Sequence, residues 1–368
     1  MRRHPQKNWR AGRFQETKAV IDIGSNSIKM RVVRKQGLLL RTLLDTTEVV
    51  RLGAGLEKGV LDEETIRHGV DVVRRLVRLA GALGARPRLV GTMALRAARN
   101  AGDFVRQVRD RAGISVEVLS GEEEARLAWL GAIHTLDVKE GSKEGPKEGS
   151  KEGSKEGPKE RSKEGSKEGS TERSTVVFDT GGGSTEFILG TGNKIKKSKS
   201  IAVGAVFLTE KFFSAGSIGP VGSETPIKPE AVDSARQYIQ ECLVRERFAE
   251  EFSFPCDSAP FVIGLGGGVV SMASVKLGLT SLVPDQINGT FLTRKDIDGQ
   301  LELYARSSLE ERMKIVGLPP KRADIILASA CIVQCALEVL KAESFRVSIN
   351  GLRHGLLIEM FGGRKGGR

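Results

Sequence analysis

Alternating apolar and polar positions open the chain and predict three β-strands, at 19–23, 28–35 and 38–50. A helix is expected from Asp62, because apolar residues from Ile66 to Ala80 recur at helical spacing and Gly81 and Gly84 stand near its end. Shorter patterns then predict a strand at 88–91, a helix at 94–112, a strand at 115–119 and a helix at 121–133.

The same order of elements recurs in the second half of the chain. Its predicted elements are strands at 175–179, 185–190 and 193–201, helices at 204–213 and 228–247, a strand at 260–264, a glycine turn at 266–268, a helix from about 270, a long helix at 321–341, a strand at 344–348 and a helix at 352–361. Three antiparallel strands followed by alternating helices and strands are typical of an α/β domain of the ribonuclease H-like type. The chain therefore contains this unit twice, as an internal duplication.

A repeat of Lys, Glu, Gly and Ser or Pro separates the two halves, at 139–173. It has a period of four residues and no large apolar side chain, so it cannot bury enough surface to offset the entropy of ordering. We expect a disordered linker there, a first domain at 19–138 joined by helix 352–361, and a second domain at 174–351. Flexible tails are expected at 1–18 and 362–368.

Composition is typical of a two-domain globular protein, but it does not indicate a function. The 368 residues are 39% apolar, which is enough for two ordinary domains, and no apolar run approaches the length needed to span a bilayer. The net charge of +12 lies mostly in the tails, since residues 1–18 hold six Lys and Arg against one Glu. We predict neither a specific nucleic-acid partner nor a membrane.

The cysteines and the N-terminus indicate a cytoplasmic protein. The four cysteines form no C-x-x-C pair and have no histidine at metal spacing, so we expect free thiols in a reducing compartment. No apolar segment of the kind found in secretory signals follows the basic N-terminal residues.

Two strand-turn segments carry the clearest chemistry in the sequence. Asp22-Ile-Gly-Ser-Asn-Ser27 and Asp179-Thr-Gly-Gly-Gly-Ser-Thr-Glu186 each place an aspartate two residues before a glycine, with hydroxyl side chains after it. Glycine lets a phosphate approach the main chain, and successive N–H groups in such a turn bind anions. We expect the two loops to form two walls of one phosphate-binding cleft.

Three adjacent glutamates begin the predicted helix at 121–133. Ser120 and Glu123 form a capping box, and the favourable interaction of a first-turn carboxylate with the helix dipole explains Glu122. Glu124 has neither of these structural explanations, and it is a candidate catalytic carboxylate.

Seven ordered blocks resemble the exopolyphosphatase and guanosine pentaphosphate phosphohydrolase family, within the actin-like and sugar-kinase-like ATPase superfamily. Besides the two loops they are Val50-Arg-Leu-Gly53, Gly91-Thr-Met-Ala-Leu-Arg-Ala-Ala-Arg-Asn100, Ser120-Gly-Glu-Glu-Glu-Ala-Arg126, Ser200-Ile-Ala-Val-Gly-Ala205 and Arg322-Ala-Asp-Ile-Ile326. The resemblance covers nearly the whole chain outside the tails and the repeat. It implies two actin-like domains that face each other across a cleft, in the short form of the family.

The resemblance also implies roles for individual residues. Glu124 falls on the family's catalytic base, and Asp179 and Glu186 would help to hold Mg²⁺ or Mn²⁺, with Asp22 as a weaker metal candidate. The phosphate-binding candidates are Gly24, Ser25, Asn26, Ser27, Gly181, Gly182, Gly183, Ser184 and Arg96, with Lys29 as a weaker candidate. The expected reaction is metal-assisted attack of water on a terminal phosphoryl group of polyphosphate or of guanosine penta- or tetraphosphate.

Some features leave alternatives open. Gly268 and Val270 stand where the family usually has hydroxyl residues, and Thr180 stands where it has an apolar one. A kinase of the same superfamily would carry similar glycine loops, and a catalytically silent sensor would keep the binding loops. The sequence does not define the preferred substrate length or the oligomeric state, for which a homodimer remains open.

Overall fold

The structure, a computed structural model, describes residues 16–37, 39–54, 56–135, 174–213, 227–252 and 260–362. The repeat expected to form a linker at 139–173 lies outside the described residues, as do nearly all of the two expected tails. No helix of the described part is long and apolar enough to cross a membrane.

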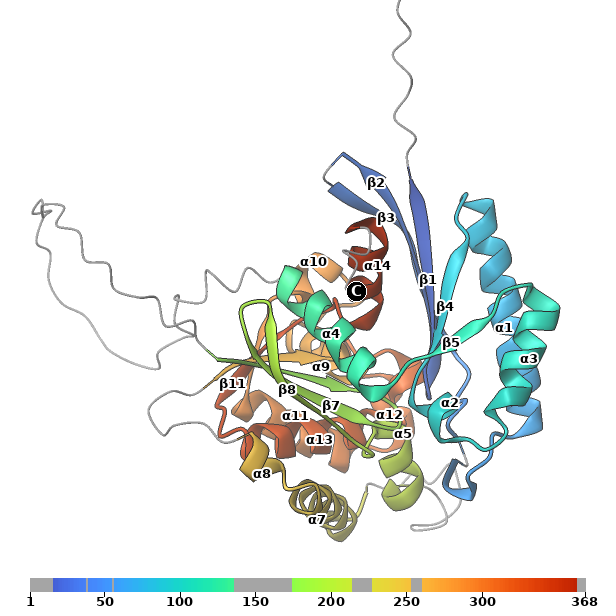
Figure 1. Ribbon diagram of the computed structural model, residues 1–368. Coiled ribbons are helices and arrows are strands. Elements are labelled where there is room, and N and C mark those ends of the chain that lie inside the picture. Colours follow the sequence, from blue (N-terminus) through green and yellow to red (C-terminus); the bar gives the residue numbers. More distant parts are fainter. Residues whose placement is uncertain are drawn as a thin grey trace, which may run out of the picture.

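The first half of the chain forms a five-stranded sheet with the order β3-β2-β1-β4-β5. Its strands are β1 (Thr17–Ile23), β2 (Ser27–Gln36), β3 (Leu39–Val49), β4 (Pro87–Gly91) and β5 (Val116–Val118). The first three strands pair antiparallel, whereas β4 and β5 are parallel to β1. Helices α1 (Glu63–Ala82) and α3 (Ala101–Ala112) pack on one face of this sheet (Figure 1).

Helix α1 shows how the local sequence sets these elements. The side chain of Asp62 accepts hydrogen bonds from the backbone N–H groups of Glu64 and Thr65, which caps the helix start. The predicted apolar stripe, which includes Ile66, Val70 and Val73, is buried against the sheet.

The second half forms a six-stranded sheet with the order β10-β11-β9-β6-β7-β8. Its strands are β6 (Thr175–Thr180), β7 (Thr185–Thr191), β8 (Lys194–Ile201), β9 (Phe261–Leu265), β10 (Phe291–Thr293) and β11 (Ser344–Val347). Helices α9 (Gly267–Lys276) and α13 (Ile326–Val339) pack on one face, and α7 (Pro229–Arg245) and α11 (Arg294–Arg306) pack on α13. Both sheets thus begin with three antiparallel strands, to which parallel strands are added on the far side of the first strand, as expected for a duplication; the second sheet ends in β10, which is antiparallel to β11.

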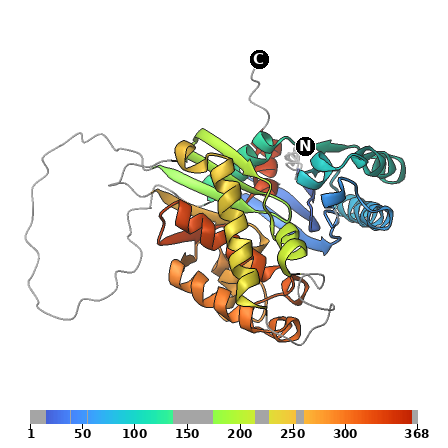
Figure 2. The same cartoon turned by 90° about the horizontal axis from the view of Figure 1, so that it is seen from below.

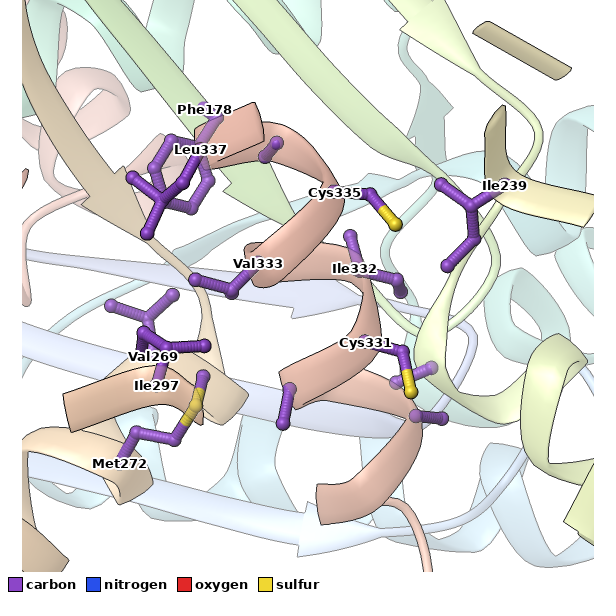
Figure 3. Packing of buried hydrophobic residues seen from close by; sticks show 14 of the residues in the cluster. Phe178, Ile239, Val269, Met272, Ile297, Cys331, Ile332, Val333, Cys335 and Leu337 are labelled. Carbon is purple, nitrogen blue, oxygen red and sulfur yellow. The ribbon is translucent and has the colours of Figure 1, made fainter. Parts of the chain in front are cut away.

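The interior of the second half is a continuous apolar cluster built around α13. Figure 3 shows Phe178 of β6 beside Leu337, and Ile239 of α7 on the other side of the helix. Cys331 and Cys335 point into this packing, and they are free thiols, as is the buried Cys242. The fourth cysteine, Cys256, lies outside the described residues.

Helices α4 (Gly121–Thr135) and α14 (Leu352–Gly362) lie between the two sheets (Figures 1 and 2). Helix α4 packs Ala128 and Trp129 on the second sheet, while its Leu127 packs with Leu356 and the first sheet. The two helices cross so closely that a Cβ atom added at Gly355 would lie 2.1 Å from the carbonyl oxygen of Leu127. This pair therefore joins the two halves of the molecule.

Several predicted elements differ from the structure. The helix predicted at 94–112 is two helices, α2 (Met93–Ala97) and α3, and the helix predicted at 321–341 begins only at Ile326, after a short 3₁₀ turn, η4 (Pro320–Arg322). The helix predicted at 204–213 is the short α5 (Ala205–Leu208), followed by a π-helical turn, η3 (Thr209–Phe213). Five elements lie where the sequence patterns predict none: α8 (Phe248–Glu251), α10 (Pro284–Ile287), β10, α11 and α12 (Leu309–Met313).

Candidate active site

The two glycine loops are equivalent turns of two equivalent hairpins. The N–H of Gly24 donates to the carbonyl of Ser27 across 3.1 Å, and the N–H of Gly181 donates to that of Ser184 across 2.9 Å. Asp22 pairs with Lys29 in the β1–β2 register, and Asp179 pairs with Glu186 in the β6–β7 register. Each hairpin therefore presents one aspartate and one second charged side chain on the same face.

The two loops meet across a cleft with an empty volume of about 750 Å³. A Cβ added at Gly182 would lie 3.1 Å from the backbone nitrogen of Asn26, so the loops touch. The cleft is lined by every candidate from the sequence analysis except Arg96: Asp22, Gly24, Ser25, Asn26, Ser27, Lys29, Glu124, Asp179, Gly181, Gly182, Gly183, Ser184 and Glu186. Residues far apart in the sequence thus gather in one cleft.

Glu124 enters this cleft from the first turn of α4, whose capping box forms as predicted. Its Oε2 accepts a hydrogen bond of 2.8 Å from Nη1 of Arg96, and the same nitrogen donates to the carbonyl of Leu119 across 2.9 Å. Arg96 therefore positions the carboxylate from the side, instead of lining the cleft. Burial, together with the carboxylates of Glu186 and Asp22, raises the pKa of Glu124 to about 8, against the opposing effect of Arg96.

Two hydroxyl groups hold Glu186. Its Oε1 accepts hydrogen bonds from Oγ of Ser184 (2.6 Å) and Oγ of Ser200 (2.7 Å). Burial raises the pKa of Glu186, and these hydroxyls oppose the shift. Burial and the neighbouring Glu186 also raise the pKa of Asp179, to about 7. The site thus holds several carboxyl groups whose pKa values remain raised despite these hydrogen bonds, an arrangement that favours the binding of a cation.

The weaker candidates Lys29 and Asp22 face each other in the cleft. Burial lowers the pKa of Lys29 and raises that of Asp22, while the attraction between the two groups opposes both shifts. No hydrogen bond or ion pair joins the Lys29 ammonium to another residue in the described ranges. A partly buried ammonium without such a partner can bind an anionic ligand.

Three further residues belong to the site although they were not among the candidates. Ser200 reaches Glu186 only because strand register places it opposite that residue. The guanidinium of Arg322 lies so close to the third glycine loop that a Cβ at Gly267 would be 2.2 Å from its Nη2. Met93, at the start of α2, would contact a Cβ added at Gly183. All three residues lie in blocks that resemble the family, and this resemblance was the one signal that could have identified them.

The two departures in the third glycine loop have distinct structural outcomes. A Cβ at Gly268 would lie 2.6 Å from Oγ of Ser329 on α13, so this glycine permits close packing of α9 on α13. Val270 lies on the wall of a second cavity next to the cleft. Thr180 is buried, and its hydroxyl donates to the carbonyl of Leu265 across 3.4 Å.

Comparison with known proteins identifies the family. The sequence pattern of the Ppx/GppA phosphatase family matches residues 31–143 and 166–363, and these matches take in α4, α14, the whole second sheet and the first sheet from the middle of β2 onward. The chain belongs to the Ppx/GppA phosphatase family. The family expected from the seven sequence blocks is thereby confirmed.

Curated relatives of this Ppx/GppA chain are longer proteins. It is 28% identical, over 93% of its length, to a guanosine-5'-triphosphate,3'-diphosphate pyrophosphatase of Photobacterium profundum, and 25% identical, over 93%, to a bifunctional 3-dehydroquinate synthase/phosphatase of Fusobacterium nucleatum. It spans 59% and 46% of these two relatives, respectively.

Solved structures confirm the fold. The Ppx/GppA family member of Aquifex aeolicus is 26% identical, with a TM-score of 0.70, and the match covers 95% of this chain and 99% of that one. An exopolyphosphatase from Cytophaga hutchinsonii superimposes with a TM-score of 0.76 at 21% identity, covering 95% and 99% of the two chains. The expectation of two α/β domains of the actin-like type is therefore correct.

Proposed function

We propose that this protein hydrolyses terminal phosphoanhydride bonds of inorganic polyphosphate or guanosine pentaphosphate, with Glu124 as the general base. One observation carries the proposal: Glu124, held by Arg96, lies in the same cleft as both glycine loops. A hydrolase needs a base beside the phosphate-binding groups, because a water molecule must be activated where the phosphoryl group is bound.

The phosphate would be bound by main-chain N–H groups of the two loops. The amide nitrogen Nδ2 of Asn26 is buried and has no hydrogen-bond partner among the described residues, which leaves a donor for a phosphoryl oxygen. Lys29 from the first half and Arg322 from the second half add positive charge to the same cleft. These groups would offset the charge that the phosphoryl oxygens carry in the transition state.

In the proposed step, a water molecule attacks the terminal phosphorus and gives its proton to a carboxylate oxygen of Glu124. The bridging P–O bond breaks, so orthophosphate leaves and the shortened substrate keeps the bridging oxygen. Glu124 must be ionised to act in this way, and Arg96 supports that form through its hydrogen bond.

Magnesium, or manganese in its place, fits the residues on the second hairpin. In the described ranges no three His, Cys, Asp or Glu side chains gather closely enough to hold a metal ion by themselves. Mg²⁺ requires fewer than three protein ligands, because it binds through one or two carboxylates together with substrate phosphates and water. Asp179 and Glu186 would hold the ion, with Asp22 nearby, and it would supply positive charge to the substrate phosphates.

Phosphate release in the absence of any acceptor tests the proposal. The full chain with Mg²⁺ is incubated with long-chain polyphosphate, tripolyphosphate and guanosine pentaphosphate, and orthophosphate is measured over time. We expect release from at least one of these substrates. Phosphate transfer that requires an added acceptor would identify a phosphotransferase, and binding without turnover would identify a sensor; either result would refute the hydrolase.

A further inference from the structure

A second and larger cavity continues from the catalytic cleft. Its empty volume is about 1270 Å³, and it shares Asp22, Lys29, Asp179 and Arg322 with the cleft. Its remaining wall comes from β2, β3 and the start of α14 on one side, and from α9, α10 and the 3₁₀ turn before α13 on the other. A ligand bound at the two glycine loops can therefore extend into this cavity.

Two arginines of this wall share a single carboxylate. Nε of Arg31 lies 2.7 Å from Oδ2 of Asp45, and Nη1 of Arg353 lies 2.5 Å from Oδ1 of the same residue. Arg31 is fixed further by a hydrogen bond of 2.8 Å from its Nη1 to Oδ1 of Asn350. Asp45 is the only residue in the described ranges to which Arg353 is hydrogen-bonded, so the rest of this guanidinium is available to a ligand.

The cavity wall carries more positive than negative charge. Its cations are Lys29, Arg31, Arg322 and Arg353, and its carboxylates are Asp22, Asp45 and Asp179. Burial and the nearby Arg31 lower the pKa of His354 to about 4, so that its imidazole adds no charge at neutral pH. Asp22 and Asp179 belong to the metal side of the site, which leaves Asp45 as the carboxylate that faces the two arginines.

The pairing of two arginines with one carboxylate favours the binding of an anionic ligand in this cavity. Arg31 and Arg353 are each mostly withdrawn from solvent, with side-chain exposures of 10% and 16%. Charged groups that are withdrawn from water need compensation, and one carboxylate compensates only one of two guanidinium groups. Guanidinium groups bind phosphate oxygens through paired hydrogen bonds.

We propose that this second cavity binds the phosphate groups of the substrate beyond the bond that is cleaved, with Arg353 as a specificity-determining residue. The inference rests on the proposed function, since it assumes that a phosphorylated substrate occupies the glycine loops. The distal phosphates belong either to a longer inorganic chain or to the 3'-diphosphate of guanosine pentaphosphate. A substrate with only two phosphates would gain least from this subsite.

Equilibrium binding to the full chain, measured by calorimetry with a metal chelator to prevent turnover, tests the subsite. The ligands are pyrophosphate, long-chain polyphosphate and guanosine pentaphosphate. We expect Arg353→Gln to weaken the binding of at least one of the two larger ligands about tenfold, which corresponds to one hydrogen bond to a charged group. The preference for that ligand over pyrophosphate should fall by about the same factor, and the ligand affected identifies the source of the phosphates.

A second variant distinguishes binding from a structural role. Asp45→Asn leaves both guanidinium groups in place without their shared charge, so we expect it to tighten binding of the affected ligand. If the ion pair serves only to hold the fold together, Arg353→Gln and Asp45→Asn will weaken binding alike, and the subsite is refuted. Equal weakening of pyrophosphate by Arg353→Gln would refute it as well.

Arg126→Gln provides the matched control. Arg126 of α4 forms an ion pair with Glu359 of α14, and neither residue lies on the cavity wall. The variant therefore removes an ion pair made by α14, the helix that carries Arg353, without changing the subsite. We expect wild-type binding of all three ligands. A protein that hydrolyses its substrate but is indifferent to Arg353→Gln would refute only the subsite, whereas selective binding without hydrolysis would refute only the proposed function.

Discussion

At the scale of single residues, the duplicated hairpins carry opposite charges at one equivalent position. Asp22 and Lys29 are separated by the same interval as Asp179 and Glu186, and both pairs stand opposite each other in register. The first hairpin therefore has a cation where the second has a carboxylate. In the proposed function, this difference would place the metal ion at the second hairpin and leave a positive charge on the first one for phosphate.

The sequence predicted most of these residues because they lie within short, local patterns. Spacing and turn composition were sufficient for both loops, and resemblance to the family indicated Glu124. The sequence could not predict that Arg96 bonds to Glu124 instead of lining the cleft, or that Ser200 reaches Glu186, because both contacts depend on how separate elements pack.

The raised pKa of Glu124 predicts how stability depends on pH in the metal-free protein. The pKa is about 8 in the folded state against an ordinary value of 4.5, so between these values the folded state holds a proton that the unfolded chain releases. The free energy of unfolding should therefore fall as pH rises through this range. We expect the free energy of unfolding, measured by urea denaturation at several pH values, to fall less steeply with pH in Glu124→Gln than in the wild type. If the free energies of the two proteins fall in parallel, the pKa of Glu124 is not raised.

Removing the hydroxyl of Ser200 should weaken metal binding. Glu186 would lose one of the two donors that fix Oε1, and loss of such an orienting partner typically costs 10- to 100-fold in metal affinity. We expect Ser200→Ala to raise the Mg²⁺ concentration for half-maximal activity about tenfold, with a melting temperature close to that of the wild type. Ser198→Ala, at an exposed position of the same strand, is the control, and equal metal dependence of the two variants would show that Ser200 does not orient Glu186.

At the scale of elements, the crossing of α4 and α14 determines where Glu124 stands. Helix α4 begins at the cleft and packs on both sheets, so its position fixes the carboxylate relative to both loops. The close approach depends on Gly355, next to Leu127, and on Gly131, where a Cβ would lie 2.3 Å from the carbonyl oxygen of Gly351.

The elements that sequence periodicity predicted incorrectly were altered by tertiary contacts. The helix predicted at 94–112 breaks because the side chain of Asn100 binds both the N–H and the carbonyl of Leu61, at 2.7 and 2.9 Å. The long helix predicted from 321 starts late because Pro319 and Pro320 lead into a 3₁₀ turn that places Arg322 at the cleft. Local propensity carries no information about such contacts, whereas the longer amphipathic α1 was predicted from its pattern.

Gly355→Ala should destabilise the protein and reduce its activity. The added methyl group would overlap the backbone of α4, and overpacking of this kind typically costs about 1–3 kcal/mol. We expect a lower melting temperature together with slower phosphate release, since α4 carries Glu124. Gly299→Ala in α11 is the control, because no atom lies within 4 Å of its added Cβ and alanine favours a helix interior. A Gly355→Ala variant as stable as Gly299→Ala would contradict the packing argument.

At the scale of the whole molecule, the two halves meet along a cleft. The glycine loops touch, and an ion pair between Arg51 and Asp324 joins the loop after β3 to the segment before α13. Exposed ion pairs contribute at most about 1 kcal/mol, so the α4–α14 crossing must hold the halves together more than this contact does. The duplication thus explains the central feature of the molecule: two equivalent loops face each other, and a helix from between the sheets adds Glu124, the proposed base.

The most direct test of this account follows solvent oxygen into the product. In ¹⁸O-labelled water, orthophosphate released by the wild type with Mg²⁺ should carry one solvent oxygen, because water is the attacking group. Glu124→Gln should release it about 10²- to 10⁴-fold more slowly while binding substrate nearly as well, and the neighbouring Glu123→Gln should keep wild-type turnover because glutamine also serves a capping box. Wild-type turnover by Glu124→Gln, or orthophosphate without solvent oxygen, would contradict the account.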